Sequence, residues 1–220
     1  MLNVFDGVPE AGTLSWWDER CGASDSADQA QRRIAEDRAA LTPYVTEIRG
    51  LGVLEAAYRP GGGADADKIR PVVESRLREH GDLLAAATVY APLAGGSPQH
   101  SDHRDLREVT RSLQEELGFA LTLYADDGYC LSDGRWPGFL VPGGPERPDW
   151  WERLLTEVPD IGPLEAVERV QLDADRAAAK RQLMEAYATQ WATLNEVSDP
   201  PDAHKDPESY SWEFFWTLAR

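Results

Sequence analysis

Hydrophobic residues change their period abruptly in the middle of this chain. Residues 101–117 carry apolar side chains at helical intervals, and Gly118 is a typical helix stop. The stripe consists of Leu106, Val109, Leu113 and Leu117. Directly afterwards, Phe119 to Tyr124 alternate with the period of two that is expected of a strand. A helix followed at once by a strand predicts a sheet that is layered with helices.

Similar patterns precede this pair. The capping-box spacing of Ser26 and Gln29 predicts a helix that ends before Pro43, and a second helix is expected up to about His80. Between and after them, two segments have strand-like composition. These are residues 53–58 and the more apolar residues 83–90. We therefore predict an α/β or α+β fold with a small mixed sheet.

A hairpin and a helical C-terminal region complete the prediction. Asp126 to Gly128 is a turn signal, so residues 129–131 are expected to return antiparallel to residues 119–124. The Gly- and Pro-rich stretch after residue 142 divides a sheet-containing region, 1–142, from a helical region, 143–220. One long helix is expected from Pro163 to about Asn195. We expect the two regions to pack as one body.

The charge balance narrows the class of partner. The chain has 39 acidic and 22 basic residues, which gives a formal net charge of −17. This negative field repels nucleic acids and anionic membranes, so neither is an expected partner, whereas a basic protein is. Two cysteines and the lack of a signal-peptide pattern favour the cytoplasm. A homo-oligomer is left open.

One local cluster has the composition of a catalytic site. His100, Asp102 and His103 could act as an acid–base group with an orienting carboxylate, or could bind a metal ion. Asp102 is equally well explained as the cap of the following helix. We therefore keep the cluster as the alternative catalytic site, and predict no metal and no cofactor.

Tyr124 to Asp127 match a four-residue string, Y-x-D-D, in which reverse transcriptases hold divalent cations. That chemistry needs another aspartate on a neighbouring strand, and residues 83–90 contain none. We interpret the string as a hairpin turn.

Aromatic side chains gather near the C-terminus and at one earlier doublet. They suit either the core or a binding surface. The residues predicted for binding are Trp150, Trp151, Trp212, Phe215 and Trp216. The C-terminal members are expected to pack against the protein itself more readily than against another chain.

No other catalytic motif is present, and no family is identified from the sequence. The surplus of carboxylates and the aromatic clusters favour a non-catalytic acidic binding protein, in the manner of an immunity protein or antitoxin that inhibits a basic partner. Two alternatives remain. One is a small-molecule enzyme that uses His100, Asp102 and His103, and the other is an oligomeric assembly component that uses the long helix.

Overall fold

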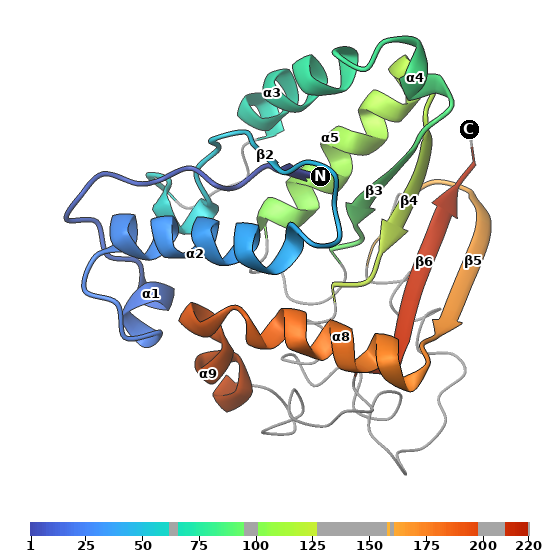
Figure 1. The fold of residues 1–220 in the computed structure, drawn as a ribbon. Coiled ribbons are helices and arrows are strands. Elements are labelled where there is room, and N and C mark those ends of the chain that lie inside the picture. The colour runs from blue at the N-terminus through green and yellow to red at the C-terminus, as the bar shows by residue number, and fades with distance from the viewer. Residues whose placement is uncertain (62–65, 95–100, 127–157, 159–160, 198–209, 220) are drawn as a thin grey trace.

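The fold is a mixed sheet with helices on both sides (Figure 1). The computed structural model describes residues 1–220 except 62–65, 95–100, 127–157, 159–160, 198–209 and 220. The strands are β1 (Leu2–Asn3), β2 (Arg49–Gly50), β3 (Thr88–Pro92), β4 (Ala120–Tyr124), β5 (Leu164–Gln171) and β6 (Trp212–Leu218). The helices are α1 (Trp16–Arg20), α2 (Ser26–Leu41), α3 (Ala66–Arg78), α4 (Asp82–Ala85), α5 (Ser101–Leu117), α8 (Ala174–Glu185) and α9 (Ala188–Val197), with a 3-10 helix at Ala56–Tyr58.

The strands form two sheets. β1 and β2 pair in parallel, and the larger sheet has the order β3-β4-β6-β5. β3 and β4 are parallel, whereas β6 runs antiparallel to both of its neighbours. The crossovers β1–α2–β2 and β3–α5–β4 are therefore βαβ units. The predicted small mixed sheet layered with helices is confirmed.

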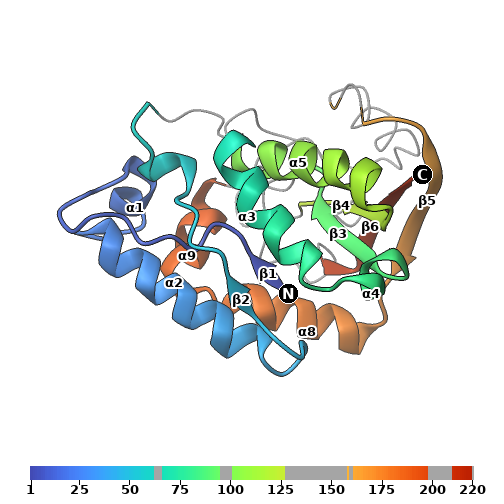
Figure 2. The ribbon, with the colours of Figure 1, turned by 90° about the horizontal axis from the view of Figure 1, so that it is seen from above.

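Helix boundaries follow the expected chemistry. α2 begins one residue after its N-cap, Asp25, whose side chain accepts hydrogen bonds from the N–H groups of Ala27 and Asp28 at 2.7 and 3.4 Å. Ser26, which the sequence suggested as the start of a capping box, is therefore the first residue of the helix. α3 and α5 lie together on one face of the larger sheet (Figure 2).

The core lies between these two helices and the strands. It contains side chains from the stripes of both helices and from the inward faces of β3 and β4. Fully buried members include Ile69, Leu93, Leu113, Leu121 and Leu123. Val4, which follows β1, joins the same core, so the small sheet packs against the large one. Among the described residues, no helix is long and apolar enough to cross a membrane.

The aromatic C-terminus forms a central strand. β6 lies between β4 and β5, and Trp216 pairs in register with Leu123 and Val167. The Trp216 side chain is 0% exposed, so it is part of the core. The expectation that this cluster packs against its own chain agrees with the placement of β6.

Two predicted elements are wrong, and a third, the strand at 83–90, is confirmed only in its second half. The helix expected from Pro163 begins as a strand, β5, and the remainder is divided into α8 and α9, with Asp173 as the N-cap of α8. Residues 53–58 form no strand and end in the 3-10 helix, while the short β2 precedes them. Residues 83–90 divide between α4 and β3.

Several predictions fall outside the described residues. These are the return arm of the hairpin at 129–131 and the predicted binding residues Trp150 and Trp151. The division at residue 142 stays a prediction. β5 and β6, from the second region, nevertheless share one sheet with β3 and β4 from the first.

Candidate active site

The carboxyl ends of the parallel strands bring polar groups together. β3 leads into Leu93 and Ala94, and β4 leads into Ala125 and Asp126. The N–H group of Ala94 donates to Asp126 Oδ2 at 2.8 Å, which ties the two strand ends together. Ala94 has a φ of +55°, a conformation that residues other than glycine rarely adopt. Such a conformation needs support from its surroundings, and Asp126 provides it.

His103 faces the same aspartate. It lies in the first turn of α5, and its Nδ1 is 2.8 Å from Asp126 Oδ1. The Asp126 side chain is only 4% exposed, whereas that of His103 is 28% exposed. The pair is therefore an imidazole with an orienting carboxylate beneath it and access to solvent above it, the arrangement used in acid–base catalysis.

Asp102, beside His103, joins α5 to the segment that follows β2. Its Oδ2 accepts a hydrogen bond from the N–H group of Ala56 at 2.7 Å, and its Oδ1 forms an ion pair with Arg59. Asp102 therefore anchors the 3-10 helix, which contradicts the simpler view that it only caps α5. As a result, the residues that follow β2, β3 and β4 all meet at one end of the sheets.

Arg59 contributes buried N–H donors to this end of the sheets. Its side chain is 8% exposed, and Nη2 binds Asp102. Within the part of the chain that the structure describes, Nε and Nη1 are buried and have no hydrogen-bond partner. Buried donors without a partner are rare in native proteins because they lose their bonds to water. Such donors are suited to binding an oxygen atom of a ligand.

A buried polar network supports the 3-10 helix from the other side. Asp18 is 0% exposed and accepts hydrogen bonds from Tyr58 Oη at 2.8 Å and from Ser26 Oγ at 2.6 Å. Arg33 forms an ion pair with the same carboxylate and donates to Tyr58 Oη at 3.0 Å. Arg33 Nη1 also lies 3.5 Å from Glu55, the residue that precedes the 3-10 helix. The network thus connects α1 and α2 to the site.

Burial and charge shift the pKa values of three site residues upward. Burial raises the pKa of Glu55 and that of Asp102, and the neighbouring Arg33 and Arg59 offset only part of this effect. Burial lowers the pKa of His103, but the carboxylates of Asp126, Asp102 and Glu55 outweigh it, so the pKa lies above 6.5. His103 therefore binds a proton more readily than an ordinary histidine does.

The structure brings together only part of the site that the sequence predicted. Asp102 and His103 belong to it, whereas His100 lies outside the described residues. Among the predicted binding aromatics, Trp216 is in the core, while Trp212 and Phe215 are half-buried on β6. Sequence reasoning missed Arg59 and Asp126. An aspartate directly after a strand was the available signal for Asp126, because such positions collect ligands in α/β folds.

A metal site is not complete in the described residues, where no three His, Cys, Asp or Glu side chains gather to hold an ion. Asp102 and His103 are already engaged with Arg59 and Asp126, respectively.

Comparisons with known proteins give a clear structural result. No family model and no curated protein matches this sequence. The crystal structure of the A40926 pseudoaglycone deacetylase Dbv21 is similar over 100% of this chain and 84% of its own, with 26% identity and a TM-score of 0.68. A deacetylase from the teicoplanin biosynthesis pathway is similar at 19% identity and a TM-score of 0.70, and the similar region spans 86% of that protein's chain. The zinc-inhibited form of the teicoplanin deacetylase Orf2 is similar at 18% identity and a TM-score of 0.69.

This likeness corrects the functional prediction. The similar solved structures, which match 100% of this chain, are deacetylases and therefore enzymes. The hypothesis of a non-catalytic acidic inhibitor was therefore wrong, and it was wrong because a charge surplus reports solubility as readily as binding. A basic protein partner and a homo-oligomer stay predictions.

Proposed function

We propose that this chain is a hydrolase that removes an acetyl group from the nitrogen of a glycosylated small molecule. The observation that carries the proposal is the His103–Asp126 pair, which lies at the carboxyl ends of β3 and β4 in a fold shared with deacetylases. Ligands of open α/β sheets bind at this end of the strands. The likeness to Dbv21, at 26% identity over the whole chain, supports the reaction class.

The residues can be given roles in this reaction. Water attacks the acetyl carbon, the C–N bond breaks, and the products are acetate and an amine that has gained a proton. His103 engages Asp126 through Nδ1. We therefore assign proton transfer to the leaving nitrogen to Nε2, which a raised pKa favours.

Arg59 is positioned to stabilise the negative charge that develops on the carbonyl oxygen during the reaction. The carbonyl oxygen becomes an oxyanion when water attacks, and buried N–H donors stabilise such an oxygen strongly. Arg59 has two such donors, Nε and Nη1, next to Asp102. Zinc is named as an inhibitor for one similar structure, and the described residues alone do not form a site for it.

Acetate release tests the proposal. The protein, purified from its native host, is incubated with A40926 pseudoaglycone, with teicoplanin and with N-acetylglucosamine, and the loss of the acetyl group is followed by mass spectrometry. His103→Gln should lower kcat by about a hundredfold or more. Arg59→Lys keeps the charge but loses the planar donor pair, so we expect a lower kcat with little change in KM.

Glu165→Gln, on the exposed part of β5, serves as the matched control and should have wild-type activity. The proposal fails if none of the acetylated compounds is hydrolysed, or if His103→Gln is as active as the wild type.

A further inference from the structure

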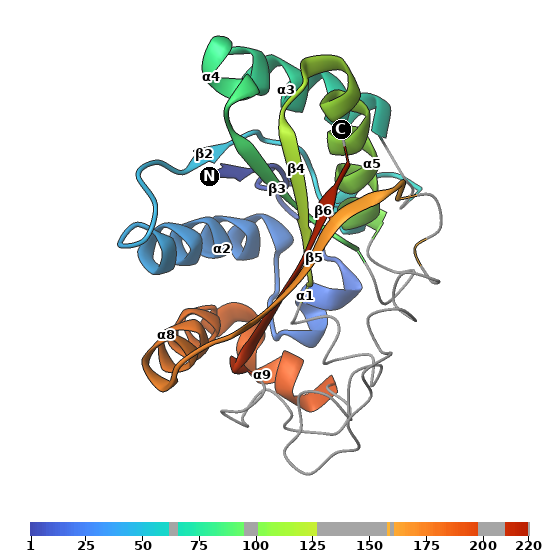
Figure 3. The same ribbon diagram turned by 90° about the vertical axis from the view of Figure 1, so that its right-hand side faces the viewer.

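Arg107 is a buried cation on the helix that carries His103. It lies one turn after His103 on α5, so the two side chains project from the same side of the helix. α5 packs against β3 and β4, as Figure 3 shows. The Arg107 side chain is 6% exposed, and a buried charge is costly unless it is paired and hydrogen-bonded. Its contacts therefore indicate what it does.

Every nitrogen of the Arg107 guanidinium has a partner. Nε and Nη2 donate to Oε1 of Glu108 at 3.0 and 2.9 Å. Nη1 donates to the backbone oxygen of Leu93 at 2.6 Å. Glu108, which is 39% exposed, balances the charge, and the backbone oxygen holds the guanidinium at the end of β3. Arg107 is therefore fixed in both position and orientation.

The oxygen that Arg107 binds belongs to the same peptide group as the N–H of Ala94. That N–H donates to Asp126 Oδ2 at 2.8 Å, and Asp126 Oδ1 lies 2.8 Å from His103 Nδ1. One peptide group thus has a cation at its oxygen and a carboxylate at its N–H. Arg107, the 93–94 peptide, Asp126 and His103 form a continuous chain of hydrogen bonds, which we call the peptide relay.

Hydrogen bonds at the two ends of a peptide group strengthen each other. A cation at the carbonyl oxygen draws electron density from the nitrogen, which makes the N–H a stronger donor. A stronger donor favours the ionised form of Asp126 and holds its carboxylate in one orientation. The φ of Ala94, +55°, also needs support from its surroundings. The orientation of the peptide, and with it that of Asp126, therefore depends on both partners.

We propose that Arg107 is a positioning residue that acts on His103 through the 93–94 peptide and Asp126. The inference rests on the proposed function, in which His103 transfers a proton to the leaving nitrogen. Arg107 itself binds Leu93 and Glu108, so its effect on the reaction is indirect. Arg107→Met should lower kcat by roughly ten- to a hundredfold with little change in KM, because a misplaced catalytic group slows the chemical step.

The pKa of His103 separates this role from a simple charge effect. Loss of a nearby cation on its own raises the pKa of a histidine, because the protonated form is no longer repelled. Burial lowers the pKa of His103, and the contact with Asp126 is the largest opposing effect, so a poorly aligned carboxylate lets the pKa fall. We therefore expect a lower His103 pKa in Arg107→Met, measured by NMR titration. Arg107→Lys should give a value between those of Arg107→Met and the wild type, because the ammonium group can still donate to the backbone oxygen.

Two other carboxylates act on the same imidazole and stay in place in these variants. They are Asp102, on α5, and Glu55, before the 3-10 helix. Arg59 pairs with the first, and Arg33 lies 3.5 Å from the second. A change in the titration can then be assigned to Arg107.

Arg104 provides the control for lost charge. It follows His103 directly on α5, but its side chain is 49% exposed, so solvent screens it. Arg104→Met should leave the pKa of His103 unchanged or raise it slightly, the opposite of the change expected for Arg107→Met.

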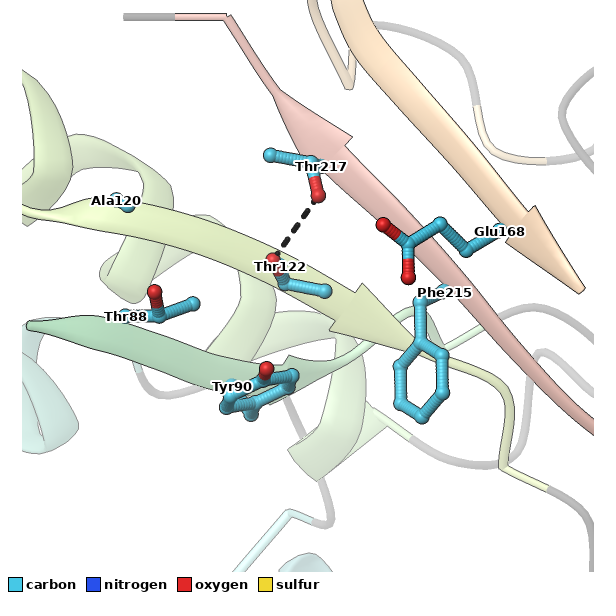
Figure 4. A pocket seen from close by; sticks show the side chains of 7 residues that line it. All are labelled: Thr88, Tyr90, Ala120, Thr122, Glu168, Phe215 and Thr217. Carbon is cyan, nitrogen blue, oxygen red and sulfur yellow. Dashed lines mark hydrogen bonds between the residues drawn. The ribbon is translucent and has the colours of Figure 1, made fainter. Parts of the chain in front are cut away.

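The other face of the sheet provides the control for a lost hydrogen bond. Figure 4 shows a hollow of about 270 Å³ there, where Thr122 Oγ1 and Thr217 Oγ1 are 3.1 Å apart. Thr122 lies on β4, which leads to Asp126, but it points away from α5, because its neighbours Leu121 and Leu123 point into the core. Thr217→Val removes this bond and should leave the pKa of His103 unchanged.

The wild-type protein gives a test that does not depend on the folding of any variant. The N–H of Ala94 and the imidazole of His103 share Asp126, so the amide proton of Ala94 should shift with the same midpoint as the His103 titration. The N–H of Leu93 donates to Tyr124 O instead, at 2.8 Å, and its amide proton should shift far less.

Three results would overturn the proposal. The first is a wild-type Ala94 amide signal that does not respond to the His103 titration. The second is a His103 pKa that is unchanged or higher in Arg107→Met, and the third is a pKa in Arg107→Lys as low as that in Arg107→Met. The titrations need no substrate, so their outcome is separate from that of the acetate-release assay, whose failure would refute the proposed function alone.

Discussion

His103 and Asp126 approach to 2.8 Å between Nδ1 and Oδ1, although one lies at the start of α5 and the other directly after β4. The same aspartate accepts the N–H group of Ala94, after β3. One carboxylate therefore aligns the imidazole and also supports the backbone at the neighbouring strand end. Its replacement should have separable electrostatic and structural effects.

Asp126→Asn should lower the pKa of His103. The amide carries no charge, so the burial of the imidazole, which lowers the pKa, is no longer outweighed by the adjacent carboxylate. A histidine titration followed by NMR measures the change, with His103→Gln used to assign the signal. Asp175→Asn, in the exposed first turn of α8, is the control and should leave the titration unchanged. An unchanged His103 pKa in Asp126→Asn would contradict the role given to this pair.

The stability of the protein should fall as the pH rises above about 6.5. A pKa that is higher in the folded state than in the unfolded state contributes stability below the unfolded value, and this contribution is lost as the pH passes the folded value. The pKa of His103 is raised above 6.5, so the loss falls on the alkaline side of that value. Urea unfolding at a series of pH values measures it.

The raised pKa values of Asp102 and Glu55 act in the same direction at lower pH, because their ionised forms are the less favourable ones in the folded state. His103→Gln should flatten the profile above 6.5 and leave the acidic part in place. If the stability of the wild-type protein rises with pH above 6.5, another titrating group dominates the pH dependence.

The buried network around Asp18 should be a strong determinant of stability. Asp18→Ala leaves Arg33 buried without its carboxylate and removes the acceptor for Tyr58 and Ser26. Loss of one partner of a buried ion pair destabilises by about 3 to 5 kcal/mol. Chemical denaturation measures the free energy of unfolding, and Asp173→Ala, an exposed N-cap, should lower it by only about 1 kcal/mol. Equal losses in the two variants would argue against a tightly coupled network.

Trp216 should matter far more to stability than another tryptophan of the chain. Its side chain is 0% exposed in the central strand, whereas that of Trp16 is 62% exposed. Trp216→Ala should lower the free energy of unfolding by about 3 to 5 kcal/mol, because it leaves a large cavity. Trp16→Ala should change it by less than about 0.5 kcal/mol. Thermal unfolding followed by circular dichroism compares the two.

Local signals predicted the parts of the fold that local interactions determine. α2 and α5 have clear caps or stops and regular apolar stripes, and both are confirmed within one or two residues. β5 was mistaken for helix because Val167 and Val170 are three residues apart, which suits a helix as well as an exposed edge strand. Only pairing with β6, from a distant part of the sequence, makes this segment a strand.

The candidate site could likewise be predicted only where its residues are close together in the sequence. Asp102 and His103 are adjacent in the sequence, so their cluster could be recognised. Arg59 and Asp126 reach them across 43 and 23 residues, and only the meeting of the strand ends brings them there. Asp126 was interpreted as a turn residue because Asp and Gly at this spacing are common in hairpins.

The position of β6 has a consequence for biosynthesis. The last strand of the described chain is an interior strand of the larger sheet, with β4 on one side and β5 on the other. While residues 212–218 are still inside the ribosome, β4 and β5 have no common neighbour to join them. The larger sheet can therefore close only after residues 212–218 have left the ribosome.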